Sequence, residues 1–108
     1  MALPQLVKAL NDPATGSTAA MALGEIGQEA VVTIPDLTKM LASSHAGERS
    51  EAAVALARLS AFQPLPNEVV GHITQLANDQ EQVVRMSAER AIEILMDNQP
   101  KLVRVFDR

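Results

Sequence analysis

The residues that could carry chemistry in this chain are few, and they do not form a recognisable catalytic set. Ser43, Ser44 and His45 are consecutive, and the second histidine, His72, lies far along the chain. A serine nucleophile needs a base and a third, orienting group that meet through the fold, and neighbouring residues of a polar turn do not supply them. We therefore interpret the three consecutive residues as a turn and predict no catalysis.

Metal and thiol chemistry are not expected either. The chain has no cysteine, so disulfides, thiolate nucleophiles and cysteine-ligated zinc are excluded. Two carboxylate pairs, Glu48 with Glu51 and Glu89 with Glu93, each share a predicted helix face, but nothing around them in the sequence predicts burial. The sequence thus predicts neither a metal site nor a cofactor.

Length and charge describe one acidic domain. The chain has 108 residues, with 9 Lys and Arg against 13 Asp and Glu, so its formal net charge is −4. A surface for nucleic acid or anionic membrane requires a concentrated basic patch. No apolar stretch reaches the length of a membrane span, and the first residues lack the pattern of a secretory signal. We predict a single cytoplasmic domain over residues 1–108 that binds neither nucleic acid nor membrane.

The order of apolar residues repeats along the chain. The segment ALPQLVKAL at residues 2–10 returns as TIPDLTKML at 33–41, at an offset of 31 residues. The segment STAAMALGEIG at 17–27 returns as SEAAVALARLS at 50–60, at an offset of 33 residues. A weaker third copy continues the second segment at an offset of 36 residues, with Arg85, Ala88, Ala91, Ile92 and Leu95. Such internal periodicity is typical of repeat proteins.

The spacing within each copy predicts helices. Apolar residues recur at i, i+3, i+4 and i+7, and proline and Asn-Asp clusters separate the segments. One helix pair cannot bury its apolar stripe alone, whereas three stacked pairs form a continuous core. We expect helices near residues 3–11, 15–28, 34–43, 47–61, 66–78 and 80–97. The repeats then span about 2–28, 33–61 and 66–97, followed by a tail at 98–108.

The second helix of each repeat is predicted to have an inward and an outward stripe. Alanines at 19/52/88 and 22/55/91, with Leu23 and Ile26, would point inward and let neighbouring second helices approach closely. The outward stripe would mix apolar and charged residues: Met21, Gly24, Glu25, Val54, Ala57, Arg58, Arg90, Glu93 and Ile94. A mixed strip of this kind suits a segment of another protein. The candidate partner-binding residues are Met21, Glu25, Val54, Arg58, Arg90 and Glu93.

Three segments of the chain resemble HEAT repeats, particularly the short repeats of phycobilisome-lyase-like proteins. They are ALPQLVKALNDP, AAMALGEIG and VVRMSAERAIEIL. The resemblance covers about residues 2–97. It implies an all-α, right-handed solenoid of three helix pairs whose second helices line a concave, protein-binding face. It also implies that a turn aspartate and an arginine at the second helix link neighbouring repeats. The matching positions are Asp12, Arg49, Asp79 and Arg85, whereas the first repeat has Gly16 at the arginine position.

From this resemblance we predict a non-catalytic scaffold that binds another protein on the concave face. The alternative is an accessory subunit related to bilin lyases, holding a tetrapyrrole or its carrier protein, although such proteins generally span more repeats. The His-Glu dipeptide of the di-iron HEAT hydroxylases does not occur. A HEAT-like DNA glycosylase would need a basic concave face and a stacking aromatic, and the acidic balance and missing Trp and Tyr argue against it.

The last segment of the chain is predicted to cap the third repeat. Residues 100–106, PKLVRVF, contain Phe106, one of only two aromatic residues in the chain. A solenoid end exposes a helix pair that a further repeat would cover, so terminal repeats need capping. We expect the segment to fold back onto its own chain, giving a monomer; the alternative is docking on a second copy, giving a homodimer.

Deletion of residues 100–108 tests this capping prediction. If the segment caps its own chain, the truncated protein melts at a lower temperature and both forms are monomers. If it docks on a second copy, the molecular mass of the full chain depends on concentration and falls to that of a monomer after deletion. Unchanged melting temperature and mass, measured by thermal unfolding and light scattering, would contradict both versions.

Overall fold

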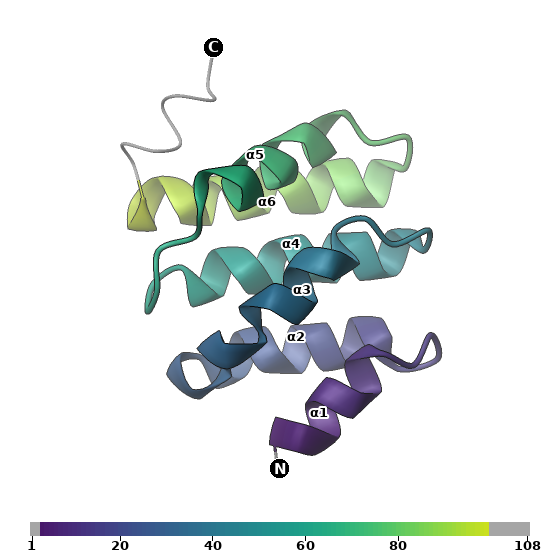
Figure 1. Cartoon of the computed structure of the whole chain (residues 1–108). Coiled ribbons are helices and arrows are strands. Elements are labelled where there is room, and N and C mark those ends of the chain that lie inside the picture. The colour runs from purple at the N-terminus through teal and green to yellow at the C-terminus, as the bar shows by residue number, and fades with distance from the viewer. Residues whose placement is uncertain (1–2, 100–108) are drawn as a thin grey trace.

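A computed structural model describes residues 3–99 of the chain, and within them it contains helices and no strands. The predicted capping segment, 100–106, lies outside the described residues. Six α-helices and two 3-10 helices follow one another (Figure 1). Their bounds are α1 Leu3–Leu10, α2 Gly16–Ile26, η1 Gln28–Thr33, α3 Ile34–Met40, α4 Ala46–Leu59, α5 Asn67–Gln75, η2 Leu76–Asn78 and α6 Gln82–Asn98.

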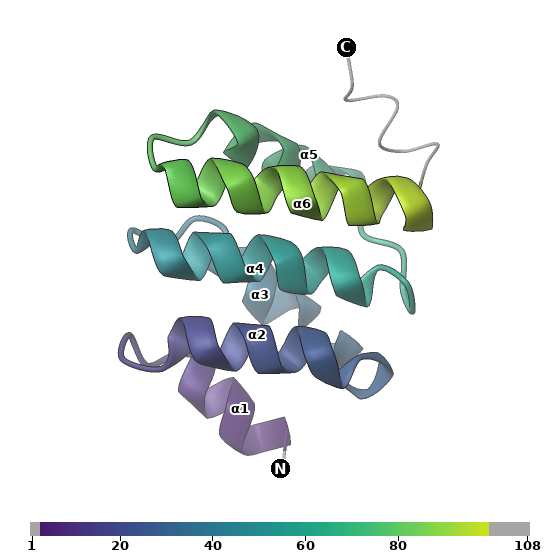
Figure 2. The same cartoon turned by 180° about the vertical axis from the view of Figure 1, so that it is seen from behind.

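The helices form two layers. Helices α2, α4 and α6 lie side by side in one layer, and α1, α3 and α5 cover its other side (Figures 1 and 2). The molecule measures 39 × 30 × 18 Å. Its smallest dimension is close to two helix diameters of about 10 Å each. The chain is therefore an all-α solenoid of stacked helix pairs, and the predicted fold is confirmed.

Local sequence explains where the helices begin and end. Pro35 lies in the first turn of α3, where its missing N–H removes no intrahelical hydrogen bond. Helix α2 ends at Ile26 and is followed by Gly27, whose φ of +83° is a conformation that glycine readily adopts. The segment that follows is the 3-10 helix η1. Its Thr33 hydroxyl donates to the carbonyl of Ala30 at 2.6 Å.

Several predicted helix bounds are corrected by the structure: α3 and α4 end at Met40 and Leu59 rather than at residues 43 and 61, and α6 begins at Gln82 rather than at residue 80. The second helix ends at Ile26 rather than at residue 28, because Gly27 stops it. Helix α6 continues to Asn98, so the predicted tail at 98–108 begins inside the helix. The Asn98 side chain donates to the hydroxyl of Ser60 at 3.0 Å, and the next residue, Gln99, pairs through its side-chain amide with the backbone N–H and C=O of Leu65. These contacts hold the end of α6 against the segment after α4.

The predicted inward stripe is buried in the second repeat, buried except for the half-buried Ile92 in the third, and only partly buried in the first. Ala52, Ala55, Ala88 and Ala91 are buried, together with the leucines between the layers. In contrast, Ile26 is 38% exposed, although its counterparts Leu59 and Leu95 are fully buried. The prediction that Ile26 points into the core is therefore wrong: together with Leu3 and Leu6 of α1 it lines a surface hollow at the end of the described stack.

The outward stripe also needs a correction, at Gly24 and Ala57. Both were predicted on the exposed face, and both are buried in the contacts between second helices. A Cβ atom on Gly24 would lie 2.9 Å from the Cα atom of Ala55, so α2 and α4 touch at this point. The carbonyl of Ala57 accepts a hydrogen bond from Asn98 of α6 at 3.4 Å. The exposed strip is narrower than the sequence predicts, because these small residues form the contact between second helices.

Replacing Leu56 with alanine tests this packing. Leu56 is fully buried in the middle repeat, and its truncation should cost about 2–5 kcal/mol of unfolding free energy, from lost apolar burial and the cavity left behind. Val32→Ala is the matched control, since Val32 is 68% exposed and should change stability by less than about 0.5 kcal/mol. Denaturant unfolding followed by circular dichroism measures both. A similar, small loss in the two variants would show that Leu56 does not support the core.

Candidate functional site

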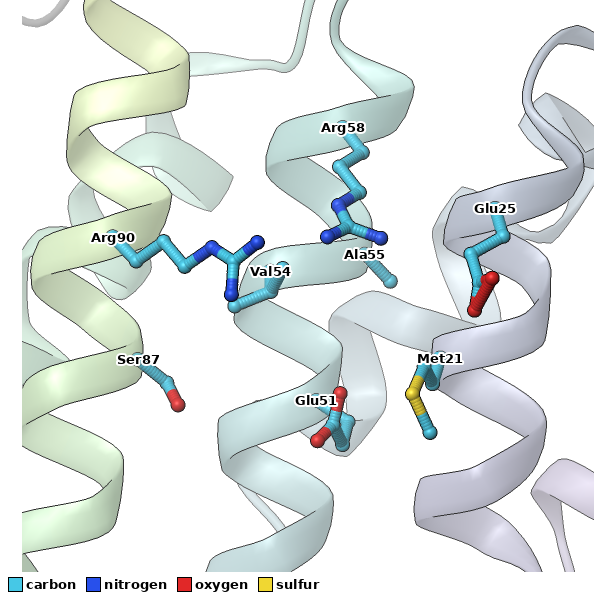
Figure 3. A pocket seen from close by; sticks show the side chains of 8 residues that line it. All are labelled: Met21, Glu25, Glu51, Val54, Ala55, Arg58, Ser87 and Arg90. Atoms are coloured by element: carbon cyan, nitrogen blue, oxygen red, sulfur yellow. The ribbon is translucent and has the colours of Figure 1, made fainter.

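A hollow of about 350 Å³ opens on the layer of second helices, and we call it the central hollow. All three second helices contribute to it (Figure 3). Its lining residues are Met21, Glu25, Glu51, Val54, Ala55, Arg58, Ser87 and Arg90. The register of the repeats explains the set, because Met21, Val54 and Arg90 occupy the same position of α2, α4 and α6, at offsets of 33 and 36 residues.

Two arginines from neighbouring helices meet at the central hollow. Arg90 of α6 reaches toward Val54, and the guanidinium group of Arg58 of α4 lies in front of Ala55 (Figure 3). The Cδ atom of Arg58 lies 3.7 Å from the place that a Cβ atom on Gly24 would occupy, so the stem of this arginine crosses the contact between α2 and α4. Within residues 3–99, neither guanidinium forms an ion pair or a side-chain hydrogen bond.

Five of the six candidate partner-binding residues line the central hollow, and Glu93 does not. Glu93 has the position of Gly24 and Ala57, which in the first two repeats faces the next second helix. On α6 that position is exposed at the end of the described stack, away from the hollow.

Sequence reasoning missed three lining residues, Glu51, Ala55 and Ser87. Glu51 precedes Val54 by three residues, and Ser87 precedes Arg90 by three. Residues three apart are neighbours on a helix surface, so this spacing could have predicted that both line the hollow. Ser87 has a structural task as well, because its hydroxyl is hydrogen bonded to that of Ser50. This contact joins α4 to α6 beside the hollow.

A second cluster of polar residues joins the turns of the second and third repeats. The Arg49 guanidinium donates from Nε to Oδ2 of Asp79 at 3.0 Å and from Nη2 to Oδ1 at 2.9 Å. Its Nη1 donates to the carbonyl of Ser43 at 2.8 Å. The two side chains are only 16% and 12% exposed. The geometry is the paired fork that arginine forms with carboxylates, and it joins two residues that are 30 positions apart in the sequence.

The electrostatics of this pair follow from its hydrogen bonds. Donation from Arg49, and next from the backbone N–H of Glu81, holds the pKa of the Asp79 carboxyl below its ordinary value. Desolvation acts in the opposite direction but is the smaller effect. The same hydrogen bond to Asp79 raises the pKa of Arg49. Both groups are therefore held in their charged forms.

The other two residues predicted to link repeats contact only their own turns. Asp12 accepts from the backbone N–H of Ala14 at 3.0 Å, as Asp79 does from Glu81. Arg85 donates to the carbonyls of Asp79 and Gln80 at 2.7 and 3.0 Å. Within residues 3–99 neither of them joins one repeat to another.

The first two repeats are joined without an arginine. Gly16 stands at the arginine position, and a Cβ atom there would lie 2.8 Å from Oε2 of Glu48. Glu48 in turn accepts a hydrogen bond from the hydroxyl of Ser43 at 2.6 Å. Arginine and aspartate are thus both missing from this junction, and Glu48 fills the space between Gly16 and Ser43.

Metal binding and membrane spanning are two further possibilities that residues 3–99 allow us to examine. Glu68 precedes His72 by one turn of α5, but no group of three potential ligands that could hold a metal ion occurs in the described chain. None of the helices in this range combines the length and the apolar content needed to cross a bilayer. The central hollow and the arginine–aspartate junction are the polar features that distinguish this fold.

The junction makes a testable prediction about acid stability. Because the native pKa of Asp79 lies below the value of about 3.9 for an unfolded aspartate, its contribution to stability is present above about pH 4 and is lost as the pH falls through the native pKa. Asp79→Asn can keep the bond to the N–H of Glu81 but removes the charge. We expect a lower melting temperature at neutral pH and a weaker loss of stability on acidification.

Arg49→Gln should produce the same two changes, and the double variant should be about as stable as either single variant. Thermal unfolding between about pH 2 and pH 7 measures this, with Asp97→Asn, an exposed carboxylate near the end of α6, as a control at neutral pH. Additive losses in the double variant would show that the two residues act independently.

Comparison with known proteins agrees with the geometry. The sequence model of the HEAT-repeat family matches residues 1–57, which is more than half of the chain. Neither the curated proteins nor the solved structures contain a significant match. The family match agrees with the stacked helix pairs. The chain belongs to the HEAT-repeat family.

Proposed function

We propose that the chain is a cytoplasmic, non-catalytic scaffold that binds a segment of another protein in the central hollow. HEAT repeats are generally protein-interaction scaffolds. The observation that supports this role most directly is the pair of arginines at the hollow, Arg58 and Arg90, which form no ion pair within residues 3–99. They stand beside apolar side chains on a surface to which three helices contribute.

The composition of the hollow supports an interface. Met21 is 43% exposed, and Val54 is partly exposed between the two arginines. Arginine and methionine are enriched where proteins bind one another, because both offer a large contact area and adapt to the partner. An apolar centre surrounded by charges is the usual arrangement of such a surface.

The polar groups of the hollow support binding more than catalysis. They are two carboxylates, two guanidinium groups and the hydroxyl of Ser87, which is already hydrogen bonded to Ser50. Neither histidine lines the hollow, so its hydroxyl has no neighbouring imidazole that could act as a base. These groups can orient a bound segment through charge and hydrogen bonds.

Reversing the charge of the two arginines tests the proposal. Arg58→Glu with Arg90→Glu should lower the capture of wild-type partners from a cell lysate about tenfold, which corresponds to about 1.4 kcal/mol. The melting temperature should change little, since neither arginine forms an ion pair within residues 3–99 and charges at the surface contribute weakly to stability. Quantitative mass spectrometry of the captured proteins provides the measurement.

The matched control is Lys8→Glu with Lys39→Glu. It reverses two exposed charges on α1 and α3, in the layer of first helices. Partners that bind in the central hollow should be captured by this control as well as by the wild type. Equal capture by all three proteins, or equal loss in both variants, would contradict binding in the hollow.

A further inference from the structure

We propose that the central hollow recognises a carboxylate of its protein partner, an Asp or Glu side chain next to an aliphatic residue, held between Arg58 and Arg90. This inference rests on the proposed function and adds to it the chemistry of the bound segment. It follows from which arginines form hydrogen bonds within the fold, from the contacts that fix the helices carrying Arg58 and Arg90, and from the charges around these two residues.

Four arginines lie within residues 3–99, and they divide into two pairs. Arg49 and Arg85 are used by the fold, since both donate to the carbonyls of turns and the first also binds Asp79. Arg58 and Arg90 form no such contact in the described chain, and both line the hollow. The donors that the fold leaves unused are thus gathered at one place on the surface.

The two helices that carry these arginines are held at a fixed separation. The hydroxyls of Ser50 and Ser87 are hydrogen bonded between α4 and α6. At the other end of α4, Asn98 donates to Ser60 and to the carbonyl of Ala57. Because this frame exists before a ligand binds, little backbone ordering is needed on binding.

The two side chains offer donors to one anion. Arg90 of α6 reaches toward Val54, and the guanidinium group of Arg58 of α4 lies in front of Ala55 in the same hollow, so a carboxylate between the two groups would accept from both (Figure 3). Guanidinium forks donate to carboxylates in pairs, as Arg49 does to Asp79 in this same chain. The neighbouring apolar surface of Val54 and Met21 would then receive the aliphatic residue next to the acid.

The remaining charges restrict which anions fit. Glu25 and Glu51 also line the hollow, and Glu25 stands on α2, the helix farthest from Arg90 among the three (Figure 3). A run of phosphates or acidic residues would bring negative charge against them, whereas a single acid would not. The two glutamates instead favour a basic residue of the partner beyond the aliphatic one. The occupant that fits is an acidic–aliphatic–basic segment of a protein.

Selection from a library of random 12-residue peptides displayed on phage tests the inference with the full chain as bait. Peptides selected by the wild type should be enriched in Asp or Glu next to Ile, Leu, Val or Met. A synthetic peptide of the consensus sequence should bind Arg58→Gln/Arg90→Gln at least about tenfold more weakly than the wild type. Lys8→Gln/Lys39→Gln, which removes two exposed charges from the first helices, should bind as the wild type does.

A second peptide, with the acid replaced by its amide, completes a double-mutant cycle. It should bind the wild type as weakly as the consensus peptide binds the arginine variant, and combining both changes should add little. Full additivity would show that the acid contacts something other than the arginines and would overturn the inference.

Two further outcomes separate the inference from the proposed function. Met21 is an exposed residue of the hollow. If the selected peptides are not enriched in acidic residues but bind the Met21→Glu variant more weakly than the wild type, the carboxylate inference is wrong and binding in the hollow stands. If no peptide responds to any substitution in the hollow, Met21→Glu included, both fail. Thermal unfolding of each variant verifies that the fold is intact.

Discussion

The close approach of the second helices is the constraint on which the rest of this structure depends. Between α2 and α4 the separation is set by Gly24, where a Cβ atom would lie 2.9 Å from the backbone of Ala55. Between α4 and α6 the separation is again set by small residues. The hydroxyl of Ser50 is hydrogen bonded to that of Ser87, and the carbonyl of Ala57 accepts a hydrogen bond from Asn98, the last residue of α6. Small side chains let helix backbones approach, and the leucines between the layers then pack without voids.

The central hollow follows from this approach. Once the backbones are close, the residues beside the contact have no room between the helices and project from the layer together. The repeat places Met21, Val54 and Arg90 in one row, and the stem of Arg58 lies across Gly24. The hollow is thus formed by the same residue periodicity that forms the core, which is why helical spacing alone predicted five of its eight lining residues.

What the sequence could not predict depends on neighbours rather than on the helix itself. Helical periodicity defines a stripe but not which flank of it meets the next helix, so Gly24 and Ala57 were placed on the exposed face. It also treats every repeat alike, although Ile26 lacks the cover that Leu59 and Leu95 receive. The HEAT resemblance placed Arg49 and Asp79 at junctions between repeats, but periodicity could not show that one arginine reaches the following turn.

The third repeat differs from the others on the side where a further helix would pack. Ser50 and Ala57 of α4 and Ser60 just after it contact α6, and the positions 36 residues further on hold the larger Met86, Glu93 and Met96. Glu89 likewise stands 36 residues after Ala53. All four are exposed. A helix approaching α6 as closely as α6 approaches α4 would collide with these side chains and bury the carboxylates of Glu89 and Glu93, which form no ion pair within residues 3–99. Burying such charges is costly. Small residues let α2, α4 and α6 pack closely, but the larger residues on the outer side of α6 disfavour an equally close contact there. A helix that packs against this side of α6 must lie at a wider spacing.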